Sequence, residues 1–170
     1  MFEQLLPIDS DLVTGFMGVF SRYEYALKNS GFANGGEEEV RPNWDAFARD
    51  IADEFDRLDK PRFREAVDYL VTSPPRKQVL IGQRLEWKES PPNGAARVSS
   101  QALLMVRRVR NNLCHGGKYW IPDDERRGRN EKLVKASLAV LLACLPLNAD
   151  VRDTFGPLFD DADRLCRLAA

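Results

Sequence analysis

The sequence predicts an all-α fold, a helical bundle with one irregular insertion around residues 73–99. Two observations predict it. Apolar side chains recur every three or four residues along most of the chain, and residues that start or stop helices flank these segments. The length of 170 residues suits a single domain, here residues 1–170.

Three helices are expected in the first half of the chain, at about residues 11–29, at residues 44–58 and from residue 61 onward. Asp9 or Ser10 can cap the first, and Asn43 can cap the second. A turn-rich connector, "NSGFANGGEEEVRP", separates them. The third begins with a proline, whose fixed φ suits a first helical position. The three apolar stripes are Leu12, Phe16, Val19, Phe20, Tyr23 and Leu27; Phe47, Ile51, Phe55 and Leu58; and Phe63, Val67, Leu70 and Val71.

The chain loses its helical periodicity between residues 73 and 99. The segment begins with "SPP", closes with "SPPNG", and shows only partial alternation in "QVLIGQRLEWK". We expect an extended segment that packs on the bundle, and a short strand pair is one structure that it can form. Helices resume at about residues 99–115 and 130–145. The latter is the most apolar and is expected to be the central buried helix, ended by Pro146 and followed by one or two short helices.

The charge of the chain limits how it can bind nucleic acid. The net charge is −1, so any affinity for phosphates must come from a local patch. Residues 107–135 hold nine Lys or Arg against four Asp or Glu, and residues 37–60 hold nine acidic against four basic residues. Both runs also fit solvated helix faces, and the sequence leaves the two interpretations open.

Cysteine usage and hydropathy favour a cytoplasmic protein without a membrane partner. The three cysteines, Cys114, Cys144 and Cys166, lack the paired spacing of a disulfide framework. Neither CxxC nor HxxxH occurs, so we expect no structural zinc site and no cofactor. The first residues lack the basic and apolar regions of a signal peptide. The longest apolar run, residues 138–147, is too short to cross a bilayer.

The predicted helix at residues 99–115 separates an apolar stripe from a polar flank. At about 100° per residue, a core stripe forms from Ala102, Met105, Val106, Val109 and Leu113. The adjoining flank holds Arg107, Arg110, Asn111, Cys114 and His115, together with Leu103 and Leu104. His115 is the single histidine of the chain. A satisfied core histidine is disfavoured, because His115 lies off the core stripe. A histidine placed by the helix dipole would explain His115 but not its polar and apolar neighbours.

The segment "RNNLCH", residues 110–115, matches the Arg-Asn-x-x-x-His signature of the HEPN superfamily. The segments "FSRYEYALKNSGF", "PNWDAFARDI", "LEWK" and "RNEKLVKASLAVLLAC" resemble those of stand-alone bacterial HEPN proteins. The resemblance implies a HEPN-like helical bundle and a metal-independent RNA endonuclease. It also implies a homodimer with a composite cleft, in a toxin–antitoxin, stress or phage-defence context.

The residues of the motif fit the chemistry that the resemblance implies. Attack of a ribose 2′-hydroxyl on the adjacent phosphate needs a base, an acid and a cation for the developing charge. His115 suits the base or the acid, and Arg110 suits the phosphate because its planar fork pairs with two oxygens. One histidine cannot be base and acid at once, so we expect a two-fold dimer at residues 99–115, sealed by Leu103 and Leu104. We expect Asn111 to orient other groups rather than to react.

Several weaker candidates accompany the motif. Arg107, Lys118 and Tyr119 are candidates for contacts with RNA, although packing also explains the aromatic ring. Glu24 or Tyr23 is a candidate for positioning Arg110, but a surface bridge from Glu24 to the lysine four residues on is the simpler prediction.

The alternative function is a non-catalytic HEPN-like module for binding RNA or protein or for dimerisation. A purely structural interaction protein is a third class. The RNA target, the trigger, a cognate antitoxin and the role of residues 73–99 are left open.

Overall fold

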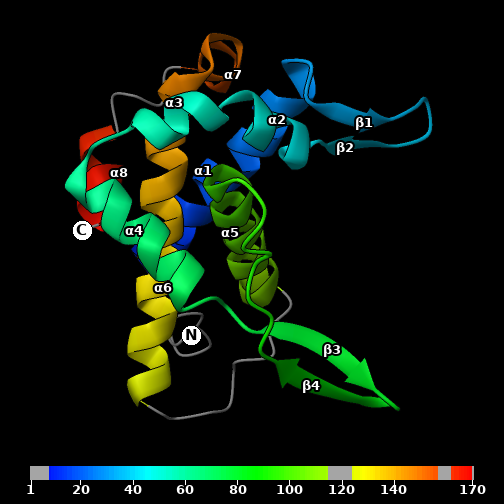
Figure 1. Cartoon of the computed structure of the whole chain (residues 1–170), viewed down its shortest axis with the longest axis vertical. Helices are drawn as coiled ribbons and strands as arrows, with labels where there is room; N and C mark the ends of the chain where they lie inside the picture. The colour runs from blue at the N-terminus through cyan, green and yellow to red at the C-terminus, as the bar shows by residue number, and fades with distance from the viewer. Residues whose placement is uncertain (1–7, 115–123, 157–161, 170) are drawn as a thin grey trace.

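The computed structural model describes residues 8–114, 124–156 and 162–169. Within them the chain is mostly helical and carries two small antiparallel hairpins (Figure 1). The helices are α1 (Ser10–Asn29), α2 (Trp44–Asp50), α3 (Ala52–Arg57), α4 (Pro61–Thr72), α5 (Val98–Cys114), α6 (Asp124–Cys144), α7 (Ala149–Phe155) and α8 (Ala162–Leu168), with a 3₁₀ turn at Leu145–Leu147. The strands are β1 (Ala33–Gly35), β2 (Val40–Pro42), β3 (Lys77–Ile81) and β4 (Arg84–Lys88).

Helix α1 matches its prediction, whereas the helix expected at residues 44–58 is two helices. Asp9 caps α1 by accepting a hydrogen bond from the backbone N–H of Leu12 at 2.9 Å. The second helix breaks at Ile51, where φ is −85° and ψ is 2°. The expected stripe survives the break, because Phe47, Ile51 and Phe55 are all fully buried. Because of this bend, α2 and α3 both lie across the same end of the bundle (Figure 1).

The two hairpins lie outside the helical core. Strands β1 and β2 occupy the segment that we expected to be a plain connector, and Ala33 pairs with Pro42. Gly35 has φ of +129°, and a Cβ there would lie 2.0 Å from the Glu39 carbonyl oxygen, so the turn requires glycine. Strands β3 and β4 confirm the short strand pair within residues 73–99. The expectation that this insertion packs on the bundle is wrong for the pair itself, which projects from the body with Leu80, Ile81 and Leu85 exposed (Figure 1).

Helix α6 is the central helix of the core, as predicted. It packs against α1, α4 and α5 and buries Leu138, Val140 and Leu141 completely. It begins at Asp124, several residues before the predicted start. The helix ends at Cys144, next to Pro146 in the 3₁₀ turn, and α7 and α8 are the short terminal helices that we expected.

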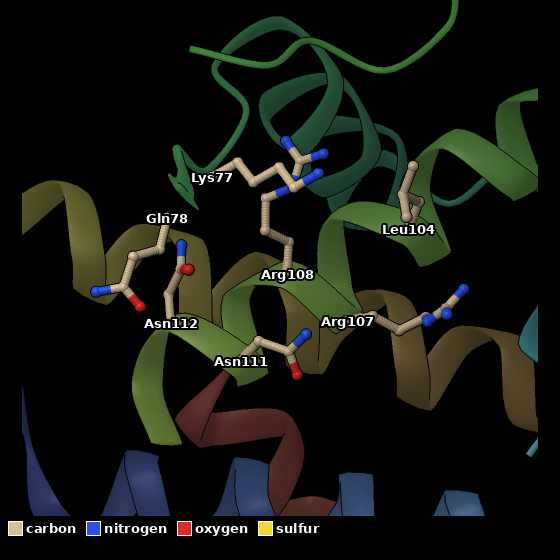
Figure 2. A pocket seen from close by; sticks show the side chains of 7 residues that line it. All are labelled: Lys77, Gln78, Leu104, Arg107, Arg108, Asn111 and Asn112. Carbon is tan, nitrogen blue, oxygen red and sulfur yellow. The ribbon is translucent and has the colours of Figure 1, made fainter. Parts of the chain in front are cut away.

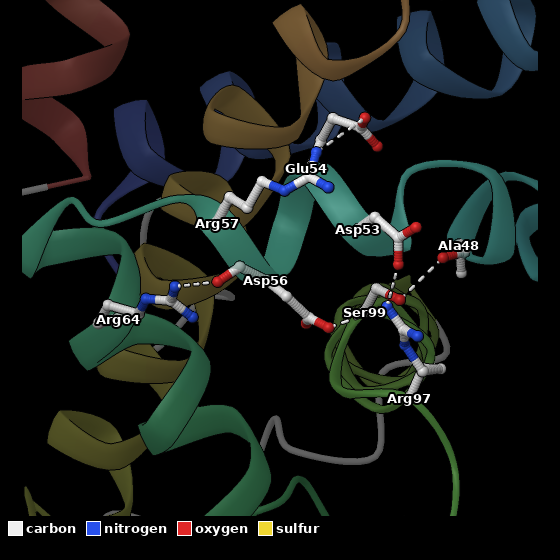
Figure 3. A network of polar contacts seen from close by, with 8 residues as sticks. All are labelled: Ala48, Asp53, Glu54, Asp56, Arg57, Arg64, Arg97 and Ser99. Atoms are coloured by element: carbon white, nitrogen blue, oxygen red, sulfur yellow. Dashed lines mark hydrogen bonds and ion pairs between the residues drawn. The ribbon is translucent and has the colours of Figure 1, made fainter.

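The start of α5 is fixed to α2 and α3 by a polar network (Figure 3). The Arg97 guanidinium donates to Asp53 at 2.6 Å and to Asp56 at 2.9 Å. The buried hydroxyl of Ser99 donates to the Ala48 carbonyl at 2.8 Å. These contacts set the position of the helix whose last turns carry the predicted site.

Among the described residues, no single helix is long and apolar enough to span a membrane. The segments Gly128–Leu147 and Ala149–Phe155, bent by 116° where they meet, have the length and composition of a span only when they are taken together.

Candidate functional site

Helix α5 buries most of the predicted stripe and, in addition, Leu103, which the helix wheel placed on the polar flank. Ala102, Met105, Val106 and Val109 are buried, and Leu113 packs partly against the core. Leu103 is only 1% exposed, so its predicted place in a dimer interface is wrong. The reason is that α2, α3, α4 and α6 all contact α5, so its buried face is wider than a single stripe. Leu104 is 39% exposed and remains free for an interface.

Arg110 lies in the last turns of α5 and is held by α1. Its Nη2 donates to Oε1 of Glu24 at 3.0 Å, and its guanidinium carbon lies 4.8 Å from the centre of the Phe20 ring. The Nε of Arg110 is buried and has no hydrogen-bond partner among the described residues. About a quarter of each side chain is exposed, 27% for Arg110 and 28% for Glu24, so the pair is partly screened by solvent. Two contacts from α1 therefore orient the guanidinium, and part of the side chain stays exposed to solvent.

Glu24, one of the two residues expected to position Arg110, makes that contact, whereas Tyr23 belongs to the core. The Trp44 indole N–H donates to Oε1 of Glu24 at 3.4 Å, a long hydrogen bond to the oxygen that Arg110 also contacts. Tyr23 is fully buried and stacks on Trp44, and it meets the rings of Phe47 and Phe155 edge-on. Burial raises the pKa of Tyr23 well above its usual value, with a smaller contribution from Cys144.

The two asparagines of the motif lie in different surroundings. Asn111 is exposed at the surface. Asn112 is buried, and its Nδ2 donates to the Arg76 carbonyl at 2.8 Å, which ties α5 to the start of the β3–β4 hairpin. Cys114 is exposed, with its sulfur 3.8 Å from that of Met17. Asn111 is thus the exposed asparagine of the motif, whereas Asn112 is buried and serves the fold.

Arg107 joins the basic run of the sequence to the acidic one. Its Nη1 donates to Asp45 at 2.9 Å. From the sequence, both charged runs also fit solvated helix faces. In the structure, Asp45 faces Arg107 while Asp53 and Asp56 face Arg97. Part of the positive charge near the site is therefore compensated within the chain.

A pocket of about 350 Å³ opens between α5 and β3 (Figure 2). Its lining residues are mostly cationic or amide side chains: Lys77, Gln78, Leu104, Arg107, Arg108, Asn111 and Asn112. Arg108 donates to the carbonyl oxygens of Pro75 and Ser90, and burial lowers its pKa. Lys77, Gln78 and Arg108 were not predicted as site residues, because no pattern in the sequence indicates that the base of the β3–β4 hairpin lies against this part of α5.

Three predicted site residues, His115, Lys118 and Tyr119, lie outside the described residues. Among the residues that the structure describes, no three His, Cys, Asp or Glu side chains gather closely enough to hold a metal ion. No protein-family model, curated protein or solved structure matches the chain.

Proposed function

We propose that the protein is a metal-independent RNA endonuclease of HEPN type that acts as a homodimer in the cytoplasm. One observation carries the proposal. Glu24 and Phe20 hold the guanidinium of Arg110 at the end of α5, in the segment where the sequence places His115 five residues later. A cation fixed before substrate arrives needs little reorganisation when charge develops on a phosphate.

The arrangement supports a cyclising cleavage of the RNA backbone. A base takes the proton of a ribose 2′-hydroxyl, whose oxygen attacks the adjacent phosphorus. An acid protonates the departing 5′-oxygen, which leaves a 2′,3′-cyclic phosphate. Arg110 keeps N–H donors beyond the one used by Glu24, and these stabilise the phosphorane charge. His115 serves as the base or the acid, and Asn111 orients the substrate.

A homodimer supplies the second imidazole that this chemistry needs. Residues near a two-fold axis meet their own copies, so a dimer built on α5 pairs two Arg110 and two His115. The exposed side chain of Leu104 on that helix supports such an interface. A toxin–antitoxin, stress or phage-defence role, with a cognate antitoxin as partner, belongs to the same proposal.

The second candidate is a non-catalytic HEPN-like module that binds RNA or protein or mediates dimerisation. The same contact favours it, because the pair of Arg110 and Glu24 also packs α5 against α1. A catalytic role requires that Arg110 act on RNA, whereas this candidate requires only that it support the fold.

Cleavage of labelled RNA in EDTA distinguishes the two candidates. We expect wild type to cut, and His115→Ala to be slower by about 10²- to 10⁴-fold, the usual contribution of a positioned acid or base. Arg110→Ala should be similarly damaging, and Arg110→Lys should restore little because lysine lacks the planar fork. Arg41→Lys is the matched control, since Arg41 also pairs with a glutamate but lies on the exposed strand β2. A folded, dimeric His115→Ala that cuts as fast as wild type would refute the catalytic role of His115, and a wild type that cuts no RNA would favour the non-catalytic module.

A further inference from the structure

We propose that the pocket between α5 and β3 is a phosphate subsite for single-stranded RNA, which holds a backbone phosphate adjacent to the one at Arg110. This inference rests on the proposed function, since it names where that substrate continues beyond the cleavage site. The pocket is the one lined by Lys77, Arg107 and Arg108 together with amide side chains (Figure 2).

The lining of the pocket has a surplus of positive charge. It contains three cations and no carboxylate. Of the three, Arg107 is compensated by Asp45 outside the lining. Arg108 donates to the carbonyl oxygens of Pro75 and Ser90 and to the Ser90 hydroxyl, all of them neutral acceptors, so these contacts leave its charge uncompensated. Lys77 is exposed on β3 and faces the same space.

This charge arrangement favours an anion with several acceptor oxygens. Burial already disfavours the charged form of Arg108, and a second cation in the same pocket adds repulsion. A phosphate would offset both effects, and hydrogen bonds between ionised partners are about twice as strong as neutral ones. The side-chain amides of Gln78 and Asn111 add donors and acceptors for a sugar or a base edge.

The position of the pocket on α5 favours an RNA backbone over a free anion. Arg107 lines the pocket and lies three residues before Arg110, so the two occupy neighbouring places on the helix surface. A strand held at Arg110 therefore passes the pocket within one turn of helix.

The same contacts assign a role to the insertion at residues 73–99. Arg108 binds the carbonyl of Pro75 before β3 and that of Ser90 after β4, so one side chain of α5 holds both ends of the hairpin. The ion pair between Arg76 and Glu89, at 2.6 Å, closes the hairpin beside these contacts. These contacts place the base of the hairpin as the second wall of the pocket, and this wall contributes Lys77 to the lining.

Binding of a 2′-O-methyl RNA oligonucleotide to the full-length protein tests the subsite without cleavage, because the attacking hydroxyl is blocked. Lys77→Glu should weaken binding by about tenfold or more, as expected for loss of a hydrogen bond to a charged group. Lys77→Ala should lower the slope of log K against log salt concentration by about 0.7, the value for one phosphate contact on a single strand. Arg84→Glu is the matched control, the same charge change at the far end of the same hairpin. Arg84→Glu should weaken RNA binding clearly less than Lys77→Glu does.

A second variant and a second ligand complete the test. Gln78→Glu, which changes a lining side chain with little change in shape, should also weaken RNA binding. Inorganic pyrophosphate, titrated alone, serves as the free anion. The inference is overturned if Lys77→Glu and Gln78→Glu bind RNA like wild type, if wild type binds no RNA, or if only pyrophosphate binds in a Lys77-dependent way. RNA binding that depends on Lys77 in a protein that cuts nothing supports the subsite and refutes the nuclease. Conversely, cleavage that depends on His115, together with RNA binding that Lys77→Glu does not change, supports the nuclease and refutes the subsite.

Discussion

Nη2 of Arg110 donates to Oε1 of Glu24 at 3.0 Å, a contact between α5 and α1 across 86 residues of sequence. The oxygen that accepts this bond also accepts from the Trp44 indole, and Phe20 lies under the guanidinium. Four side chains from α1, α2 and α5 thus meet at the end of the helix that carries the motif. If Arg110 acts on RNA, this cluster sets its geometry, which makes Glu24 a positioning residue.

Glu24→Gln tests that role. The amide keeps the shape of the side chain but loses the charge that fixes Arg110, so we expect the rate of RNA cleavage to fall by about tenfold or more. The free energy of unfolding should change by less than about 1 kcal/mol, because the pair is partly exposed. The measurement combines cleavage kinetics with urea unfolding. Glu39→Gln, which removes the charge from an exposed pair on the β1–β2 hairpin, is the matched control. Equal cleavage rates for Glu24→Gln and wild type would remove the positioning role.

Ser99→Ala tests how the start of α5 is held. The hydroxyl donates to the Ala48 carbonyl in the core, and its loss leaves a buried acceptor unpaired. We expect the free energy of unfolding to fall by about 1–3 kcal/mol. Ser100→Ala is the matched control on the next residue of the same helix, which is less buried, and it should be neutral or slightly stabilising because alanine favours helix. Urea unfolding measures both, and an equal effect of the two variants would contradict the assigned hydrogen bond.

Tyr23 and Cys144 predict that stability falls at alkaline pH. Burial raises the pKa of both groups, so the unfolded chain loses their protons at a lower pH than the folded chain does. The unfolded state then binds fewer protons, and stability declines as pH rises. The decline should begin near pH 8.5 for the thiol and near pH 10 for the phenol, at up to about 1.4 kcal/mol per pH unit for each group. Urea unfolding between pH 7 and 11 measures it.

Tyr23→Phe separates the two contributions and also tests the role of Tyr23. The Tyr23 hydroxyl is buried without a partner among the described residues, so its removal should leave stability at pH 7 equal or higher and flatten the decline above pH 10. The rate of RNA cleavage should not change, because the ring packs in the core. Tyr25→Phe, at an exposed ring beside Arg22, is the matched control. A loss of cleavage in Tyr23→Phe alone would restore Tyr23 as a supporting residue of the site.

Leu104→Asp tests the dimer. A charge at this exposed leucine of α5 would be buried in an interface built on that helix, so we expect dissociation to monomers at micromolar concentration and loss of cleavage. Leu85→Asp makes the same change at a more exposed leucine on the β3–β4 hairpin, and it should leave the dimer intact. Sedimentation velocity reports the oligomeric state. A monomeric wild type, or a dimer broken by Leu85→Asp and not by Leu104→Asp, would place the interface elsewhere or remove it.

The sequence by itself determined the helices, because their signals are local. The apolar period and the caps at Asp9 and Asn43 need no knowledge of distant residues, and they predicted α1, α4, α5 and the buried α6. The helix wheel likewise separated Val106 and Val109 from Arg110 and Asn111. The motif at residues 110–115 is also a property of the sequence alone, and its chemistry stays a prediction.

The tertiary structure decided everything that depends on which surfaces meet. Glu24 has a lysine within reach on its own helix, yet its carboxylate accepts from Arg110, because α1 and α5 bring the two side chains together. Leu103 is buried because four helices contact α5, and a helix wheel does not show how many neighbours a helix has. The break at Ile51 and the pocket beside Arg108 have the same origin. Contacts between residues far apart in the chain depend on how helices pack, and packing is a property of the whole set of surfaces rather than of any one segment.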